Sequence, residues 1–320
     1  MTRDELLMLQ ALPLDIKILK TKQRLRDAID YFGVEHLFLS VSGGLDSTVL
    51  HYILKELEED DNLPHIPRVF SNTGNEYDGV LLNARSLCDV EVKPLMTPHE
   101  VWTKVGYPVG SKKIARMIHD LQNPTEKNAK SRNLYLNGIR SDGQKGSSYS
   151  KLAKRYYPFI EPDCPYKVSN KCCDILKKEP MKRYQKESGR YPIIATMADE
   201  GGTRAQTYLQ TGCNAFNQGK SLPIGFWTKQ DILQYIVNNN IPIPPEYGEI
   251  IEVDGKLDTT LEKRTGCFIC MFGVHLEKGE NRFQRMKRLY PRKWNYAINV
   301  LKIGEVLDLY GVDYGREDNE

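Results

Sequence analysis

The sequence predicts an α/β fold in which a mainly parallel β-sheet carries helices on both faces. Short apolar runs alternate with amphipathic stretches along the first two thirds of the chain, and this alternation is typical of βαβ units. A glycine-rich turn follows the first apolar run directly, between that run and a helical pattern. No apolar run approaches the length of a membrane span.

The elements follow in a regular order. The first thirty residues have apolar positions at helical spacing, and residues 36–41 form a continuous apolar run that suits a buried parallel strand. A helix is expected next over residues 48–59. Further strands are expected over residues 68–71, 90–94, 192–197 and 221–225. We therefore predict a nucleotide-binding domain over residues 1–247, with a basic insertion at about 97–165, and a basic, mostly helical C-terminal region over residues 248–320.

The composition is that of an ordinary water-soluble domain. Hydrophobic residues make up 40% of the chain, charged residues make up 27%, and the formal net charge is +3. The N-terminus lacks the pattern of a signal peptide, so we expect a cytoplasmic protein without membrane contact. Two segments are strongly basic, with twelve Lys or Arg against three acidic residues over 104–155 and eight against one over 278–302. They are either polyanion-binding surfaces or solvated helical faces.

The turn after the first strand reads Ser-Gly-Gly-Leu-Asp-Ser. Two glycines let the backbone approach an oxyanion closely, and the following helix directs its first N–H groups at a phosphate. The chain has neither GxxxxGK[ST] nor GxGxxG at this position, so a P-loop lysine and a dinucleotide fingerprint are both absent there. The candidate phosphate-binding residues are Ser42, Gly43, Gly44, Asp46, Ser47 and Thr48.

Further motifs follow in a fixed order. They are Ser71–Glu76 (SNTGNE), Ala198–Arg204 (ADEGGTR), Trp227–Asp231 (WTKQD) and Ile241–Tyr247 (IPIPPEY). With the glycine-rich turn they resemble the PP-loop ATP pyrophosphatases, in particular the PAPS/APS reductase family. The resemblance implies an adenine nucleotide alpha hydrolase-like (HUP, Rossmann-like) fold that binds ATP, APS or PAPS. It places Thr73 and Gly74 near the nucleotide and Arg204 on phosphate or sulfate, although Gly201 stands where the family has serine.

Four of the seven cysteines form a candidate metal centre. Cys172 and Cys173 are adjacent, and Cys267 and Cys270 form a CxxC pair. Zinc, an iron–sulfur cluster and free thiols are all compatible with such a set, but Lys171–Pro180 resembles the paired-cysteine signature of APS reductases. That resemblance implies a 4Fe–4S cluster on these four residues. Cys164 is a substitute ligand, and we expect Cys88 and Cys213 to be ordinary buried residues.

The residues after Cys270 affect which reaction we predict. Sulfonucleotide reductases carry a nucleophilic cysteine in a mobile tail, whereas no cysteine follows Cys270 here. We therefore favour ATP cleavage between the α- and β-phosphates with adenylation and sulfur transfer to an acceptor. Asp46 would orient the loop or a Mg²⁺ ion, and Arg204 would stabilise charge on the phosphates.

Several partners are compatible with this reaction. The acceptor can be a nucleic acid (tRNA or DNA) bound through the two basic segments, and a cysteine desulfurase or a thiol can donate the sulfur. The alternatives are a sulfonucleotide reductase with a non-standard thiol and a nucleotide-binding regulatory or defence module without turnover.

Overall fold

Six strands form the sheet of the nucleotide-binding part in the computed structural model, which describes residues 1–316. Their order is β3-β2-β1-β4-β6-β5, and every pairing is parallel except the one between β5 and β6. The predicted α/β class with a mainly parallel sheet is therefore confirmed. The strands are β1 (Leu37–Val41), β2 (Arg68–Ser71), β3 (Val90–Val92), β4 (Tyr191–Ile194), β5 (Asn214–Ala215) and β6 (Lys220–Ser221).

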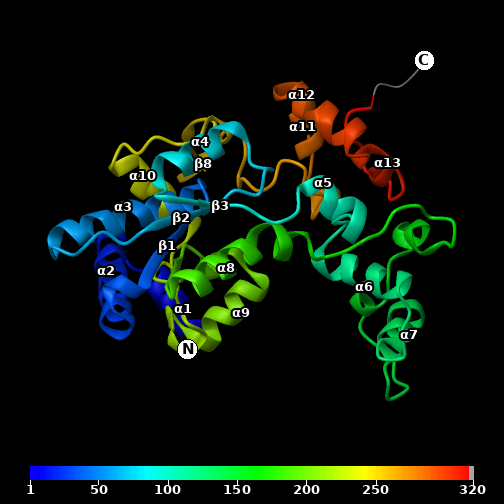
Figure 1. Cartoon of the computed structure of the whole chain (residues 1–320), viewed down its shortest axis with the longest axis horizontal. Coiled ribbons are helices and arrows are strands. Elements are labelled where there is room, and N and C mark those ends of the chain that lie inside the picture. Colours follow the sequence, from blue (N-terminus) through cyan, green and yellow to red (C-terminus); the bar gives the residue numbers. More distant parts are fainter. Residues whose placement is uncertain (317–320) are drawn as a thin grey trace. The chain divides into compact units, whose positions relative to one another are not determined.

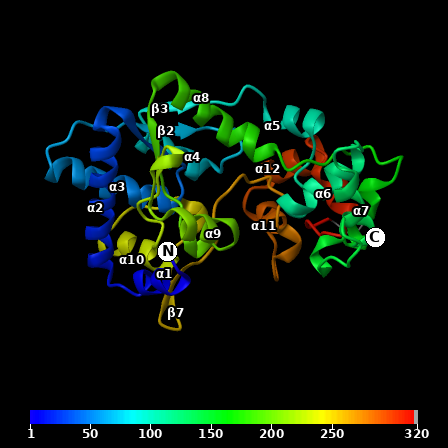
Figure 2. The ribbon, with the colours of Figure 1, turned by 90° about the horizontal axis from the view of Figure 1, so that it is seen from below.

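The chain divides into two compact units. The first unit comprises residues 1–72, 76–93 and 179–266, and the second comprises residues 73–75, 94–178 and 267 onward. The second unit thus takes in the basic insertion together with the C-terminal region, whereas residues 248–266 lie in the first unit. Figures 1 and 2 show the elements of each unit in two orthogonal views.

The helices of the first unit surround the sheet. Val41 and Phe70 share one face of the sheet with α3 and α4, and Phe38 packs edge-on against Tyr184 of α8 on the other face. This arrangement is that of a doubly wound sheet. The helices are α1 (Arg3–Gln10), α2 (Leu14–Phe32), α3 (Leu45–Asp60), α4 (Asp78–Leu87), α8 (Glu179–Ser188), α9 (Gly202–Thr211) and α10 (Lys229–Asn238), with short turns η1 (Val34–His36), η6 (Ala198–Glu200), η7 (Phe216–Gln218) and η8 (Pro245–Tyr247).

Local sequence explains how these helices begin. Pro13 separates α1 from α2, so the predicted N-terminal helix is two helices. A capping box starts α10 at Thr228, because the Thr228 hydroxyl accepts the Asp231 N–H while the Asp231 carboxylate accepts the Thr228 N–H. Trp227, fully buried just before this cap, donates its indole N–H to Thr21 at 2.9 Å.

One part of the first unit differs from the expectation. β7 (Ile250–Val253) and β8 (Lys256–Thr259) pair as an antiparallel hairpin in the segment expected to be mostly helical. The turn between them contains Asp254 and Gly255, both at positive φ. An Asp-Gly pair between two short extended runs is a hairpin signal in the sequence.

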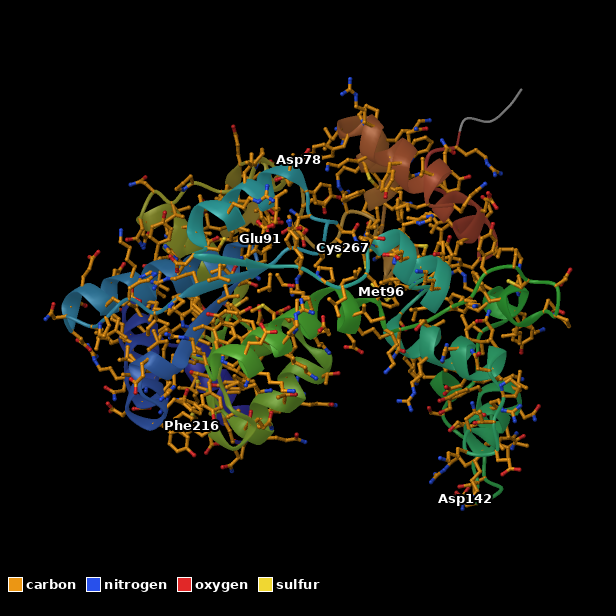
Figure 3. The ribbon with its side chains drawn as sticks, viewed as in Figure 1. Asp78, Glu91, Met96, Asp142, Phe216 and Cys267 are labelled. Atoms are coloured by element: carbon orange, nitrogen blue, oxygen red, sulfur yellow. The ribbon has the colours of Figure 1, made fainter. Side chains whose placement is uncertain are left out.

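The second unit is mostly helical. Its core contains Trp102, Phe159, Phe283 and Tyr310, all nearly inaccessible to solvent. In Figure 3, Asp142 marks the tip of a turn whose arms meet at the Ile139–Lys145 bridge. The helices are α5 (Pro98–Glu100), α6 (Lys112–Gln122), α7 (Ala129–Asn137), α11 (Arg282–Leu289), α12 (Pro291–Asn295) and α13 (Ile303–Asp308), with short turns η2 (Val101–Val105), η3 (Ser148–Ser150), η4 (Lys154–Ile160), η5 (Asp174–Lys178), η9 (Val274–Leu276) and η10 (Tyr296–Val300). Over residues 1–316, no helix is long and apolar enough to cross a membrane.

Candidate functional site

The glycine-rich loop joins β1 to α3, as the sequence predicts. Gly43 has a φ of +73°, and a Cβ atom there would lie 2.1 Å from the carbonyl oxygen of Val80. Only glycine fits this position without displacing α4. Gly44 precedes the first residue of α3 and supplies no side-chain cap, so the first N–H groups of the helix are directed at the loop. This is the backbone form that binds an anion.

Hydroxyl groups hold the loop in shape. Ser47 Oγ accepts the Ser42 N–H at 3.1 Å and donates to the carbonyl oxygen of Gly44 at 3.0 Å, and Thr48 Oγ1 donates to the same oxygen. Ser47 and Thr48 are buried, whereas Ser42 is half-buried. The Asn83 amide of α4 completes the support by donating to the carbonyl oxygen of Gly43 at 2.9 Å. Ser47 and Thr48 therefore fix the loop, which leaves Ser42 as the more accessible hydroxyl.

The topology of the sheet indicates where a ligand binds. From β1 the chain runs to β2 and β3 on one side, and it later returns to β4 on the other side of β1. In open α/β sheets, ligands bind beyond the carboxyl ends of the strands at such a reversal. The loop Ser42–Ser47 follows β1, and Ala198–Arg204 follows β4. Both predicted anion-binding motifs therefore lie at the reversal of strand order.

Asp46 lies among charged groups of the first unit. Burial raises the pKa of its carboxyl group, and Asp199 adds to that effect. The positive charges of Arg264 and Lys229 act in the opposite direction. The carboxylate is a hard oxygen donor of the type that Mg²⁺ prefers.

Arg204 shares a buried carboxylate with a second arginine. Glu200 contacts the guanidinium groups of both Arg204 and Arg264, and its side chain is only 6% exposed. The two arginine side chains are 49% and 59% exposed. Arg204 comes from the first turn of α9, whereas Arg264 comes from the segment after β8. A buried carboxylate therefore brings together two accessible cations from distant parts of the sequence.

A cavity opens at the carboxyl end of β4. It has a volume of about 190 Å³, and its floor is formed by apolar side chains such as Ile194, Met197 and Leu222. Arg204 and Lys220 bring positive charge to its wall, and three threonines bring hydroxyl groups. A cavity of this composition accepts a ligand with an apolar part and an anionic part. The threonines are Thr196, Thr203 and Thr207.

Tyr247 connects the glycine-rich loop with the segment that carries Arg264. Its hydroxyl group lies 3.3 Å from the position of a Cβ atom on Gly44, and it is 2.7 Å from Thr265 Oγ1. Tyr247 is 3% exposed, and burial raises the pKa of its phenol. The motif that contains it also supports α4, because Glu246 Oε1 accepts the Gly79 N–H at 2.9 Å. The Ile241–Tyr247 segment thus reaches the phosphate loop.

Thr73 and Gly74 belong to the second unit with the cysteines. Thr73 is buried and its hydroxyl accepts the Asn75 N–H at 3.2 Å, while Gly74 has a φ of +77°. Thr73 Oγ1 is 3.9 Å from Cys267 Sγ. The structure therefore brings these two predicted nucleotide-binding residues together with the CxxC pair.

The four predicted ligand cysteines occupy the second unit. Cys172 and Cys173 precede η5, and Cys270 N–H donates to the carbonyl oxygen of Cys267 at 3.0 Å. A hydrogen bond to Cys173 and burial raise the pKa of Cys172, and the charges of Cys267 and Cys270 act in the same direction. Figure 3 labels Cys267.

Positive charges surround these thiols. The hydrogen bond with Cys172 lowers the pKa of Cys173 to about 6, and Lys112 and Lys177 also lower it. Burial raises the pKa of the Cys270 thiol, and the charge of Arg282 opposes this rise. Arg282 also donates to the Cys270 carbonyl oxygen at 3.1 Å. A donor set of four thiols amid cations fits a negatively charged thiolate-ligated group. Within residues 1–316, no three His, Cys, Asp or Glu side chains converge as ligands of a single metal ion.

The other cysteines have ordinary surroundings. Cys213 is buried, as predicted, and lies 3.2 Å from the Tyr208 hydroxyl. Cys88 is only half-buried, contrary to the expectation of a buried residue, because it follows the last turn of α4 at the margin of the sheet. Cys164 lies in the second unit and directs its thiol at the carbonyl oxygen of Tyr166.

Many cations of the C-terminal basic segment are engaged within the second unit. Arg288 pairs with Glu280, Lys287 lies over the Trp294 ring at 5.1 Å, and Lys293 lies over the Phe268 ring at 4.8 Å. In the insertion, by contrast, Lys127, Lys130 and Lys145 are exposed.

Sequence reasoning missed Arg264, Glu200 and Tyr247 as members of the site. Glu200 lies inside a motif that was recognised for its arginine alone. Arg264 lies three residues before Cys267, and an arginine this close to a recognised motif is a signal in the sequence. Only the fold brings Arg264 to Glu200, because 63 residues separate them (264 minus 200, less one).

Comparisons with known proteins agree with the motifs. Residues 121–271, just under half of the chain, match the family model described as the phosphoadenosine phosphosulfate reductase domain. The match confirms the predicted family resemblance over a region that includes Arg204 and the four cysteines. It supports a nucleotide-binding role of the PAPS reductase kind. Comparison with curated proteins gives no significant match.

The chain is also similar to solved structures. One of them is the phosphoadenylyl-sulfate (PAPS) reductase from Candida auris in a phosphate complex. The identity is 13% and the TM-score is 0.37, and the alignment covers 77% of this chain and 90% of that chain.

Proposed function

We propose that the chain is a PP-loop enzyme that binds ATP at the Ser42–Ser47 loop and cleaves it between the α- and β-phosphates. The observation that carries the proposal is the loop itself, in which Gly43 is fixed at positive φ and α3 begins without a side-chain cap. Arg204, half exposed at the carboxyl end of the neighbouring strand β4, supplies positive charge for the phosphates. The resulting activity is adenylation of an acceptor followed by sulfur transfer.

The chemistry of the first step follows from these groups. An acceptor oxygen attacks the α-phosphorus, the bond between the α-phosphorus and the bridging oxygen breaks, and pyrophosphate leaves while the acceptor proton passes to water. The helix N–H groups and Arg204 stabilise the charge that develops on the pyrophosphate. Asp46 orients the loop or holds a Mg²⁺ ion on the phosphates. The terminal sulfur of a persulfide on a cysteine desulfurase then attacks the adenylated atom of the acceptor, the bond from that atom to oxygen breaks, and AMP leaves with the oxygen. A thiol next reduces the resulting disulfide, which leaves the sulfur on the acceptor and frees the desulfurase.

The four cysteines are proposed to hold a 4Fe–4S cluster. Cys172, Cys173, Cys267 and Cys270 supply the thiolates, and Lys112, Lys177 and Arg282 balance their negative charge. When bound, a cluster with an accessible iron supplies a site for sulfur.

A nucleotide assay tests the first part of the proposal. Wild-type protein should bind ATP and release pyrophosphate when acceptor is present, whereas Gly43→Ala should lose binding because its Cβ atom meets Val80. Ser47→Ala is a milder second variant, and Ser86→Ala on α4 is its matched control, because Ser86 also donates to a backbone carbonyl oxygen. Equal ATP affinity in Gly43→Ala and Ser86→Ala would contradict the proposal.

The same assay separates the alternatives. Sulfonucleotide reduction is favoured by the family match and would give thiol-dependent release of sulfite from APS or PAPS. Binding of nucleotide without any product would indicate a regulatory or defence module.

Metal content tests the cysteine site. Protein purified without oxygen should contain about four irons and four sulfides per chain if a 4Fe–4S cluster is bound. Cys173→Ala should lose them, whereas Cys88→Ala should retain them, because Cys88 lies in the first unit. Zinc in place of iron, or identical iron content in both variants, would contradict the cluster.

The proposed acceptor class is nucleic acid, bound through the basic insertion. The proposal is supported by three exposed lysines of the insertion, because exposed lysines are able to contact phosphates. They are Lys127, Lys130 and Lys145. Replacing all three by glutamate should weaken the binding of labelled tRNA or single-stranded DNA and reduce its salt dependence. Unchanged binding in fluorescence anisotropy would exclude this surface.

A further inference from the structure

The contacts of Glu200 suggest a function for Arg264. A buried carboxylate is costly unless it is paired, and Glu200 is paired with two guanidinium groups at once. Its other oxygen accepts the Met197 N–H at 3.4 Å. Glu200 is therefore held by the backbone turn before α9, and it fixes the position of both arginines.

The two arginines keep donors for a ligand. Each guanidinium group has five N–H donors in a planar fork, and one carboxylate engages only some of them. Because the side chains of Arg204 and Arg264 remain about half exposed, the outward donors are accessible. A planar fork of this kind matches the oxygens of phosphate or sulfate in pairs.

Arg264 is fixed beside the phosphate loop by its neighbour. Thr265 shares a hydrogen bond of 2.7 Å with the Tyr247 hydroxyl, which in turn lies against Gly44. Among the charges that act on Asp46, the charge of Arg264 has the largest effect. Arg264 is therefore attached to the loop on one side through Thr265 and to α9 on the other side through Glu200.

We propose that Arg264 is a second ligand for the anionic chain of the nucleotide, and that Glu200 aligns Arg264 with Arg204 as a two-arginine clamp. The clamp selects nucleotides whose 5′ substituent has at least two anionic groups, such as ATP or an adenylyl sulfate, over AMP. Glu200 is a positioning residue, since it acts only through the arginines. This inference rests on nucleotide binding at the Ser42–Ser47 loop.

Calorimetric titration with ATP, APS and AMP tests the clamp. Arg264→Ala should weaken ATP and APS binding by roughly tenfold or more, because charge-assisted hydrogen bonds are lost. AMP binding should change by less than about threefold, because the loop binds its single phosphate. Arg264→Lys should restore only part of the affinity, since a lysine cannot bind in fork geometry.

Two further variants complete the experiment. Arg26→Ala is the matched control, since Arg26 is an exposed arginine paired with Asp61 beyond the opposite end of α3. Glu200→Gln should also weaken ATP binding, by a smaller factor than Arg264→Ala. The losses of ATP-binding free energy caused by Arg204→Ala and Arg264→Ala should be non-additive in the wild-type background. The same two losses should be additive in the Glu200→Gln background.

The possible outcomes distinguish the clamp from the function on which it rests. Equal ATP affinity in Arg264→Ala and Arg26→Ala, with measurable wild-type binding, would overturn the clamp and leave the proposed function standing. Equal losses for ATP and AMP in Arg264→Ala would also overturn it. If wild-type protein binds neither ATP nor APS, both the clamp and the proposed function are overturned.

Discussion

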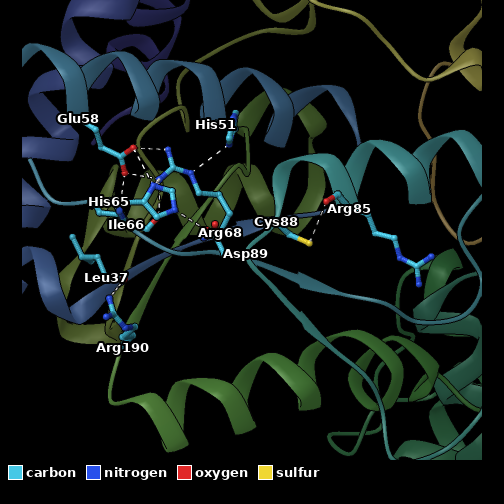
Figure 4. A network of polar contacts seen from close by, with 10 residues as sticks. All are labelled: Leu37, His51, Glu58, His65, Ile66, Arg68, Arg85, Cys88, Asp89 and Arg190. Atoms are coloured by element: carbon cyan, nitrogen blue, oxygen red, sulfur yellow. Dashed lines mark hydrogen bonds and ion pairs between the residues drawn. The ribbon is translucent and has the colours of Figure 1, made fainter.

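The first unit contains two arginine–glutamate clusters that differ in which partner is buried, one around Arg68 and the other around Glu200. Arg68 on β2 is 1% exposed, and Figure 4 shows its guanidinium group surrounded by the Glu58 carboxylate, His51 and the carbonyl oxygen of Ile66. Its contacts are 2.9 Å to Glu58 Oε2, 2.6 Å to Ile66 O and 3.3 Å to His51 Nδ1. Every face of this cation is occupied by the protein.

In the cluster at Glu200, the carboxylate is the buried partner and the cations are exposed. The two arginines, Arg204 and Arg264, are about half exposed. A cation that the protein surrounds can only stabilise the fold, whereas a cation that is fixed on one side and exposed on the other can bind a ligand. The comparison leads us to propose that exposure, rather than residue type, separates the ion pairs that only stabilise the fold from those that are able to bind a ligand.

The largest expected effect is on the buried cluster. Arg68→Ala should lower the free energy of unfolding by about 3–5 kcal/mol, because the Glu58 carboxylate loses its partner in a buried setting. Arg264→Ala should lower it by about 1 kcal/mol or less, since the Arg264 side chain is more than half exposed and the buried Glu200 carboxylate keeps Arg204 as a partner. Urea unfolding of both variants measures the difference, and similar losses in the two would remove the distinction.

A smaller effect is expected from pH at the same cluster. Burial, with the charge of Arg68, lowers the pKa of His51 from 6.5 to about 4. Above pH 6.5 the ring is neutral in both folded and unfolded chains. Between pH 6.5 and 4 the unfolded chain binds a proton that the folded chain does not, so the stability present at neutral pH is lost as pH falls.

The size of this loss is about 2 kcal/mol after allowance for solvent screening of a partly exposed ring. His51→Gln should flatten the pH dependence of urea unfolding over this range. The exposed His36 provides the control, as His36→Gln should leave the slope unchanged. Identical slopes in wild type and His51→Gln would contradict the assignment.

The smallest expected effect is a difference in salt dependence between the exposed cluster at Glu200 and the buried cluster at Arg68. Raising the ionic strength from about 0.1 to 1 M shortens the Debye length from about 10 to 3 Å, which screens exposed charges. Over this range of ionic strength, the ATP affinity of the wild-type protein should fall several-fold. The ATP affinity of Arg264→Ala should fall by a smaller factor. The difference in unfolding free energy between wild type and Arg68→Ala should change by less than about 0.5 kcal/mol, because buried pairs are screened little. Equal salt sensitivity of the two quantities would contradict the comparison.

Local patterns in the sequence were sufficient for the elements that carry the loop. The run at residues 36–41, the glycines that follow it and the helix after Leu45 are all determined by neighbours in the chain, and all are found where expected. The helix start at Thr228 is of the same kind, since a capping box needs only residues within one turn. The signal for the hairpin at residues 250–259 is also local, since it is the Asp-Gly turn, but we predicted a mostly helical segment there.

The sequence by itself determined the α/β class, the glycine-rich loop, the motif with Arg204 and the two cysteine pairs, because each depends on residues close together in the chain. Only the tertiary structure decided that Arg68 is surrounded by Glu58 and His51 while Arg264 remains accessible beside Glu200. The physical reason is that burial and charge pairing depend on which distant segments the sheet topology brings together. A one-dimensional pattern specifies which arginines exist, and the fold specifies which of them the protein itself neutralises.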